Sequence, residues 1–180
     1  MEVIQNFDWM VLHGIQGLHC RVLDSIMPLI TLLGEHGILW VVLSVVLTVI
    51  PKTRKCGIAM MLGLLLELLI GNLVLKPMIA RPRPYMLDPG ITPIVPKLAD
   101  FSFPSGHTYG ATAAGVVLFR YYKKWGIVVF ILTVLIGFSR LYLQMHFLTD
   151  VLGGVVFGFI CAEISLFIVS HFSKKKSKST

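Results

Sequence analysis

The chain alternates between long apolar segments and short polar ones, and this pattern predicts a membrane protein built from helices. A spanning helix needs roughly 20 mostly apolar residues. Five such segments lie between the charged residues, and a shorter one precedes them. The predicted spans are residues 22–34, 36–51, 56–75, 101–119, 125–139 and 151–173. We therefore predict an all-α integral membrane bundle of six transmembrane helices.

The first residues follow a different pattern, which is typical of an amphipathic helix lying on the membrane. Apolar residues recur at helical spacing, and polar residues occupy the opposite positions. The apolar positions are Val3, Phe7, Val11, Ile15 and Leu18, and the polar ones are Gln5, Asp8, His13 and Gln16. We expect this helix to precede the six spans within a single domain, residues 1–172, followed by a basic cytoplasmic tail at 173–180.

Composition agrees with a membrane protein and excludes several other classes. Hydrophobic residues make up 56% of the chain, charged residues only 14%, and the mean hydropathy is +0.81. Soluble domains carry about 25% charged residues, and disordered chains, coiled coils and nucleic-acid modules need far more polar surface. The net charge of +7 therefore indicates a bilayer as partner rather than nucleic acid. The three cysteines are widely spaced, so we expect them to be reduced.

Positive charge predicts the orientation of the spans. Basic residues cluster at 52–55, 120–124 and 174–178, which together hold 10 of the 16 lysines and arginines. These clusters fall on one side if the six spans alternate, and that side should be the cytoplasm. Both termini would then be cytoplasmic. The segments 34–37, 76–104 and 144–150 would lie outside, in a plasma or inner membrane.

Small residues predict where helices approach one another closely. They are Gly106, Gly110, Ala113, Ala114 and Gly115 in the fourth predicted span, and Gly154 and Gly158 in the sixth. Such residues permit close helix contacts in lipid. We expect these two helices to pack together.

Several polar residues lie at the outer ends of the predicted helices, where the charge rule does not expect cations. Three of them are basic, namely Lys76, Arg83 and Arg140, and a helix is expected to begin at Ser105 and Gly106. A helix N-terminus has free N–H groups that bind anions, and Gly106 allows an anion to approach the backbone. The set describes a phosphate-binding pocket.

Two histidines beside this pocket provide the groups that phosphoester hydrolysis requires. His107 and His146 could act as a nucleophile and as an acid for the leaving oxygen. His146 and Asp150 are four residues apart, so the carboxylate can hydrogen-bond one ring nitrogen and leave the other free. Because the chain offers no carboxylate cluster for Mg²⁺ or Zn²⁺, we expect neither a metal nor another cofactor.

These residues form three motifs that resemble the signatures of the type 2 phosphatidic acid phosphatase (PAP2) superfamily of membrane lipid phosphatases. The motifs are Lys76-x6-Arg83-Pro84, Pro104-Ser105-Gly106-His107 and Ser139-Arg140-x5-His146-x3-Asp150, and all eleven specified positions match in order. The resemblance implies that His146 attacks phosphorus to form a phosphohistidine, oriented by Asp150, and that His107 protonates the leaving oxygen. It also implies that Lys76, Arg83, Arg140, Ser105 and Gly106 bind the phosphoryl group.

The substrate remains open at this stage. Undecaprenyl diphosphate, phosphatidylglycerophosphate, phosphatidate and lipid A 1-phosphate all present a phosphate on an apolar stem, and Arg81 could bind a second phosphate or simply lie at the surface. A lipid-phosphate transporter and an inactive lipid-binding relative are the alternatives outside this reaction. Glu67 and Glu163 should face the bundle interior, with Glu67 about 13 Å deeper than the pocket, and His36 is a candidate for substrate contact.

Overall fold

All regular secondary structure in the described part of the chain is helical, as the apolar pattern predicts. The structure is a computed structural model that describes residues 2–178, with side chains described up to residue 173, and it contains no strand within this range. The predicted tail at 173–180 therefore lies outside the described side chains, although its backbone is helical to Lys178. The elements are α1 Glu2–Gln16, α2 Arg21–Leu32, η1 Glu35–Gly37, α3 Ile38–Val49, α4 Arg54–Leu66, η2 Glu67–Leu75, α5 Lys76–Ile79, α6 Pro84–Leu87, α7 Gly106–Tyr121, α8 Lys123–Tyr142 and α9 Leu148–Lys178.

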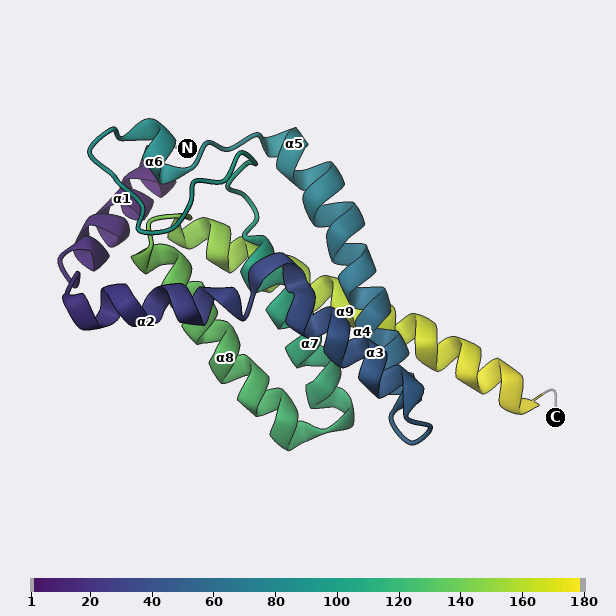
Figure 1. Cartoon of the computed structure of the whole chain (residues 1–180). Coiled ribbons are helices and arrows are strands. Elements are labelled where there is room, and N and C mark those ends of the chain that lie inside the picture. The colour runs from purple at the N-terminus through teal and green to yellow at the C-terminus, as the bar shows by residue number, and fades with distance from the viewer. Residues whose placement is uncertain (1, 179–180) are drawn as a thin grey trace.

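Helix α7 lies at the centre of the bundle, in contact with α4, α8 and α9 (Figure 1). Residues 108–118 of this helix are all buried. A Cβ atom at Gly154 would lie 2.7 Å from the carbonyl oxygen of Ser105, and one at Gly158 would lie 2.6 Å from that of Tyr109. Only glycine allows α9 to approach α7 this closely. The predicted packing of the fourth and sixth spans is thus confirmed.

Five helical segments run between the two ends of the bundle. Four of those within the described residues are long and apolar enough to cross a membrane, namely Arg21–Val49, Arg54–Leu87, Lys123–Tyr142 and Leu148–Ser173. The fifth, α7, is shorter at 16 residues but runs between the same two ends (Figure 1). The multi-pass architecture is confirmed, whereas the predicted count of six spans is not.

The difference arises at α2, which makes no crossing of its own. The backbone N–H of Cys20 donates to the Tyr142 hydroxyl at 3.2 Å, and Thr31 accepts from Arg140 at 2.8 Å, so both ends of α2 contact the last turn of α8. Twelve residues also span only about 18 Å, against about 30 Å of bilayer core. Residues 34–37 bend the chain without reversing it, and α3 continues to the far end of the bundle (Figure 1). Helices α2 and α3 therefore form one bent segment.

The two termini consequently lie at opposite ends of the bundle (Figure 1). Helix α1 packs beside the start of α9, where Asp8 accepts a hydrogen bond from the Thr149 backbone at 3.0 Å. The C-terminal end of α9 lies at the far end with the α3–α4 and α7–α8 turns. The prediction that both termini are cytoplasmic is therefore not confirmed.

Helix α1 forms where the periodicity predicts it, but one position differs from the expectation. Asp8, expected on the water-facing side, is fully buried. Val3 and Phe7, expected on the membrane-facing side, are exposed, and so are Ile4 and Met10. The buried carboxylate shows that polar contacts with the bundle determine which face of this helix is inside.

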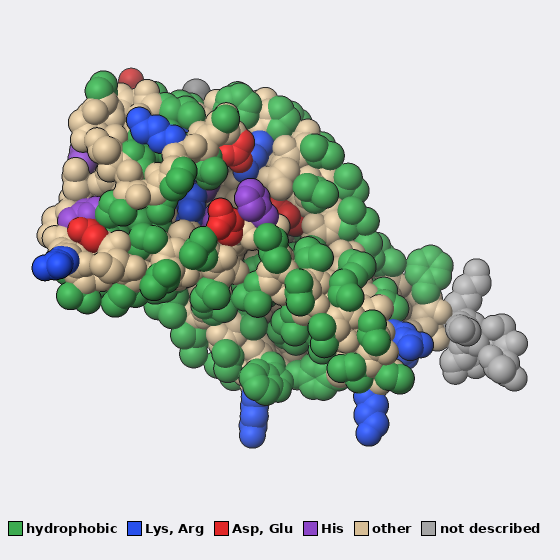
Figure 2. Space-filling view, in the orientation of Figure 1, with side chains coloured by type: hydrophobic (Ala, Val, Ile, Leu, Met, Phe, Trp, Pro, Cys, Tyr) green, Lys and Arg blue, Asp and Glu red, His purple; other side chains and the backbone are tan. Residues whose placement is uncertain are grey.

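The two ends of the molecule differ in chemistry. Figure 2 shows acidic, basic and histidine side chains gathered at the end that holds α1, α6 and the loops, while hydrophobic side chains cover much of the middle. At the opposite end Lys and Arg side chains project from the molecule. The predicted grouping of the basic turns at 52–55 and 120–124 on one side is confirmed.

Candidate active site

A cavity of about 770 Å³ opens at the end of the bundle that holds α1 and α6. Its walls come from the N-terminus of α7, the last turn of α8, the bend before α3, helix η2 and the 76–104 segment. Six of the eight predicted site residues line it: Lys76, Arg83, Gly106, His107, Arg140 and His146. The other two, Ser105 and Asp150, lie behind its wall. The fold thus assembles residues that lie up to 70 positions apart in the sequence.

Arg140 offers the cavity hydrogen-bond donors that nothing else uses. One terminal nitrogen, Nη1, donates to the Thr31 hydroxyl at 2.8 Å. Its Nε and Nη2 atoms are buried and have no hydrogen-bond partner among the described residues. Buried polar groups are normally paired, and a guanidinium binds phosphate oxygens well. The two free nitrogens therefore suit an anion in the cavity.

Lys76 and Arg83 share a carboxylate that the sequence analysis missed. Asp100 accepts a hydrogen bond from Lys76 Nζ, and its Oδ1 accepts one from Arg83 Nη2 at 2.7 Å. Burial alone raises the pKa of Asp100, but the Lys76 hydrogen bond and the charge of Arg83 outweigh it and lower this pKa to about 2. The carboxylate is therefore ionised and balances two cations of the cavity. Only its place in the loop four residues before Pro104 sets it apart in the sequence.

Arg83 also contacts His146, and this contact helps to define the state of the imidazole. Its Nη1 donates to the carbonyl oxygen of Met145 at 2.8 Å and lies 3.2 Å from His146 Nε2. An arginine can only donate, so Nε2 accepts and carries a lone pair. The other ring nitrogen, Nδ1, then carries the proton. His146, which lines the cavity, thus has its unprotonated nitrogen beside Arg83.

Ser102 connects His146 to Asp150. Its hydroxyl donates to Asp150 Oδ2 at 2.5 Å and lies 3.3 Å from His146 Nδ1, whereas Nδ1 and Oδ2 are 3.7 Å apart. The expected direct hydrogen bond between the histidine and the aspartate is thus replaced by a bridge through serine. Because the single hydroxyl proton goes to Asp150, the serine oxygen accepts from Nδ1–H. This agrees with the tautomer indicated by Arg83.

Electrostatics keep His146 neutral. Burial lowers the pKa of His146 well below its usual range, and the positive charges of Arg83, Arg140 and Lys76 lower it further, while Asp100 opposes them. A neutral imidazole in the wall of a pocket that also holds three cations has the chemistry of a nucleophile for a bound anion.

Arg81 occupies neither of the two positions considered for it. It does not line the cavity, and its guanidinium donates to Asp150 Oδ1 and to Asp8 Oδ2, both at 2.6 Å. Two carboxylates therefore already use its charge, and Arg81 is not available to bind a second phosphate. Asp8 lies about 140 residues from its partner Thr149 in the sequence. Because it occupies a polar position of an amphipathic helix, nothing in the sequence indicates that it would be buried.

The N-terminus of α7 closes another side of the cavity. The helix begins at Gly106, so the N–H groups of its first turn have no intrahelical partner. Gly106 and His107 both line the cavity. Ser105 does not, because its hydroxyl is buried and accepts from Thr108 at 3.3 Å. The predicted anion-binding backbone is in place, whereas the Ser105 side chain points elsewhere.

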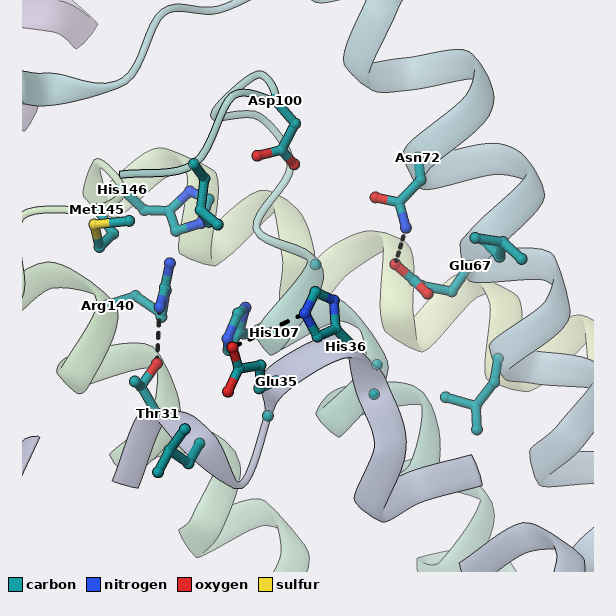
Figure 3. A pocket seen from close by; sticks show the side chains of 18 of the residues that line it. Thr31, Glu35, His36, Glu67, Asn72, Asp100, His107, Arg140, Met145 and His146 are labelled. Atoms are coloured by element: carbon teal, nitrogen blue, oxygen red, sulfur yellow. Dashed lines mark hydrogen bonds and ion pairs between the residues drawn. The ribbon is translucent and has the colours of Figure 1, made fainter. Parts of the chain in front are cut away.

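Glu67 lies in the cavity wall, a contact that the sequence did not predict. Its carboxylate accepts from the side-chain amide of Asn72 at 3.4 Å, and both residues line the cavity (Figure 3). The segment from Glu67 to Leu75 is π-helical, so residues five apart face the same side. The straight α-helix assumed in the prediction does not put residues five apart on one face.

The bend before α3 completes the rim. Glu35, His36 and His107 lie close together on one side of the cavity, opposite Asn72 and Glu67 (Figure 3). His36 has a left-handed backbone, with φ of 50°, and its ring lies 3.9 Å from the Glu35 carboxylate. The candidate contact residue thus reaches the mouth of the cavity. Glu163 lies elsewhere and accepts a hydrogen bond from Arg120 at 2.6 Å.

Comparisons with known proteins relate the chain to a family of membrane phosphatases. Residues 56–174 match the model of the PAP2 superfamily. The undecaprenyl-diphosphatase BcrC of Bacillus subtilis is 37% identical over 83% of this chain and 76% of its own length. An undecaprenyl-diphosphatase of Sulfolobus acidocaldarius is 29% identical over 86% of this chain and 74% of its own. The crystal structure of a transmembrane PAP2-type phosphatidylglycerolphosphate phosphatase from Bacillus subtilis superimposes with a TM-score of 0.77 at 30% identity, covering 97% of this chain and 88% of that one.

Proposed function

This chain belongs to the PAP2 superfamily, and on that premise we propose that it is a membrane lipid phosphatase acting through a phosphohistidine. The observation that carries the proposal is the neutral His146, whose Nε2 is unprotonated and which lines the same cavity as Lys76, Arg83 and Arg140. A nucleophile beside three phosphate-binding cations is suited to phosphoryl transfer.

The proposed reaction has two steps. His146 Nε2 attacks the terminal phosphorus, and the bond from that phosphorus to the leaving oxygen breaks while protonated His107 gives this oxygen a proton. The leaving group is the lipid alcohol of a monophosphate or the lipid monophosphate of a diphosphate. Water then attacks the phosphohistidine with His107 as base, the P–N bond breaks, and inorganic phosphate leaves. Arg140 contributes its two unpaired nitrogens to the phosphoryl oxygens, and the first-turn amides of α7 add to them. No metal takes part in this scheme, so activity should persist with a chelator.

We propose a polyprenyl diphosphate such as undecaprenyl diphosphate as substrate, with phosphatidylglycerophosphate as the alternative. The first choice is supported by two relatives named undecaprenyl-diphosphatase, and the second by the structural match to a phosphatidylglycerolphosphate phosphatase. Arg81 no longer supports the diphosphate, because Asp8 and Asp150 hold it. A transporter is less consistent with a site whose cations all lie at one end of the bundle.

For the membrane arrangement, we propose that the cavity opens on the extracytoplasmic face and that the basic turns are cytoplasmic. Residues 1–172 would form one domain with five crossings, and the N-terminus would lie on the cavity side. Helix α1 would lie at the membrane surface, where its exposed Val3, Ile4, Phe7 and Met10 contact lipid.

The test is phosphate release by the purified protein from a panel of lipid phosphates in the presence of EDTA. The panel contains undecaprenyl diphosphate, phosphatidylglycerophosphate, phosphatidate and a water-soluble phosphomonoester. We expect the lipids to be preferred, because each desolvated CH₂ contributes about 0.8 kcal/mol. Equal kcat/KM for the soluble ester and every lipid would contradict the lipid phosphatase, and activity that requires Mg²⁺ would contradict the metal-free mechanism.

A further inference from the structure

A buried carboxylate on α1 lies far from the three motifs yet touches their network. The Asp8 side chain is fully buried. Its Oδ1 accepts from the Thr149 backbone at 3.0 Å, and its Oδ2 accepts from the Thr149 hydroxyl at 2.5 Å and from Arg81 Nη2 at 2.6 Å. Burying a carboxylate is costly unless it is paired, and these contacts provide the pairing.

Arg81 is held on all sides at this position. Its Nη1 donates to Asp150 Oδ1 at 2.6 Å and to the Thr149 hydroxyl at 2.7 Å. Its guanidinium lies 4.3 Å from the centre of the Phe147 ring, and Trp9 from α1 packs edge-on against that ring at 5.0 Å. The arginine thus joins α1 to the start of α9 with little freedom to turn.

Asp150 links Arg81 to His146 through hydrogen bonds on both of its carboxylate oxygens. Its Oδ1 binds Arg81, while its Oδ2 accepts from Ser102 at 2.5 Å and from the Phe147 backbone at 2.8 Å. Ser102 in turn contacts His146 Nδ1. Any rotation of the Asp150 carboxylate would break contacts on both oxygens, so Arg81 fixes the orientation in which Ser102 meets the imidazole.

We propose that Asp8 and Arg81 are positioning residues for His146, acting through Asp150 and Ser102, so that helix α1 is part of the catalytic apparatus. The proposal rests on the phosphatase function proposed above. Neither residue touches the cavity, and both act by placing and balancing the charge that faces His146 Nδ1.

The charges in this cluster make the role measurable. Two carboxylates and one guanidinium give a net charge of −1 beside His146. Asp8→Asn raises this to 0, Arg81→Gln lowers it to −2, and the double variant restores −1. A more negative surrounding favours the protonated imidazole. The acidic limb of the pH profile of kcat should therefore move to lower pH in Asp8→Asn and to higher pH in Arg81→Gln. In the double variant it should lie near the wild-type pH.

Other charges face His146 as well, and they are unchanged in these variants. They are Arg83, Arg140, Lys76, Asp100 and the second histidine, His107. The kcat profile reports on the enzyme with substrate bound, in which the phosphate charge offsets the charge of the three cations. The charge that differs between the variants is then that of the Asp8–Arg81–Asp150 cluster. Limb shifts on the order of half a pH unit are expected for one charge at this separation.

The experiment measures kcat, KM and the pH profile of kcat with the preferred lipid of the panel. We expect kcat to fall about 10- to 100-fold in Arg81→Gln and about 3- to 10-fold in Asp8→Asn, with KM within about twofold, as for other residues that orient a functional histidine. The double variant should lose no more kcat than Arg81→Gln alone, because Asp8 acts through Arg81.

Asp24→Asn is the matched control. Asp24 also ties the N-terminal segment to α8, since its carboxylate accepts from the Tyr142 hydroxyl at 2.6 Å, but it has no contact with Asp150 or Ser102. We expect wild-type kcat and an unshifted profile for this variant. Thermal unfolding of each variant checks that the fold is retained.

Two results would overturn the proposal. One is an Asp8→Asn protein whose kcat and pH profile match those of Asp24→Asn, which would reduce the cluster to a docking contact for α1. The other is a loss of kcat in Arg81→Gln or Asp8→Asn without opposite shifts of the limb. If Arg81→Gln does not fold, the Asp8→Asn variant still tests the proposal, because the acidic limb of its kcat profile must move to lower pH. Wild-type protein inactive on every substrate would instead overturn the proposed function, which is a separate outcome.

Discussion

His146 Nδ1 and Asp150 Oδ2 lie 3.7 Å apart, too far for a hydrogen bond, and the Ser102 hydroxyl bridges them. The aspartate therefore orients the imidazole through a neutral relay. A serine hydroxyl can serve two partners only if its proton goes to one and its lone pair to the other. The bridge thus sets the imidazole tautomer, although Ser102 belongs to none of the three motifs.

Ser102→Ala should lower kcat and leave KM nearly unchanged. Removing the hydroxyl leaves Nδ1–H without its acceptor, so the imidazole loses its preferred tautomer and orientation. We expect a loss of about 10- to 100-fold, the range found for groups that orient a functional histidine. Steady-state kinetics with the preferred lipid checks this. A kcat equal to that of the wild type would show that the bridge has no catalytic role.

Asp100→Asn should lower KM, because Asp100 competes with substrate phosphate for Lys76 and Arg83. Arg83 keeps its bonds to the Asp100 and Met145 carbonyl oxygens, so the guanidinium stays in place. We expect KM to fall about 3- to 10-fold, as for the loss of one partly exposed like charge. A rise in KM would indicate that the carboxylate instead holds the two cations in a binding geometry.

The effect of Asp100→Asn on KM should not depend on pH between 5 and 8. The pKa of Asp100 is lowered to about 2, so the wild-type carboxylate is ionised throughout this range. The stabilisation from its ion pairs is present above the ordinary pKa of aspartate and is lost only as pH falls towards 2. The ratio of the two KM values at pH 5 and pH 8 measures this, and a ratio that changes several-fold would contradict it.

His146→Ala should abolish turnover and prevent the phosphoenzyme from forming. No other group can replace the nucleophile, so the loss should exceed the roughly 10²- to 10⁴-fold typical of an acid–base group such as His107. Rapid quenching with ³²P-labelled substrate, followed by alkaline denaturation to preserve phosphohistidine, checks both points. A ³²P-labelled His146→Ala protein would contradict the assignment of His146 as the nucleophile.

Residues 5 and 97 should be labelled from outside the cell, and residue 52 only from inside. All three are exposed, and the structure places the first two at the cavity end. Single cysteines at Gln5, Lys97 and Lys52 in a cysteine-free background, treated with an impermeant maleimide before and after permeabilisation, make the test. Labelling at position 5 only after permeabilisation would rule out the arrangement with five crossings.

The sequence by itself determined that the chain is helical, that it crosses a membrane and that the three cations and two histidines of the motifs gather at one end. These properties follow from local patterns, since apolar runs are long enough to span lipid and their ends lie next to the motifs. Lys76, Arg83, His107, Arg140 and His146 line the cavity as expected, because each lies at or near a helix end that points to the same side.

Only the tertiary structure decided which partners these residues have. Ser102 and Asp150 are 48 residues apart, and Asp8 and Thr149 are 141 apart, so no periodicity along the chain links them. The periodicity of α1 put Asp8 on the water-facing side, but pairing with Arg81 makes its burial favourable. Likewise, α2 is apolar enough for lipid, yet bonds at both of its ends to the last turn of α8 hold it at one end of the bundle. The hydrophobic pattern of a segment indicates how much of it is removed from water. The burial of Asp8 and the position of α2 depend instead on contacts that exist only after the helices have packed.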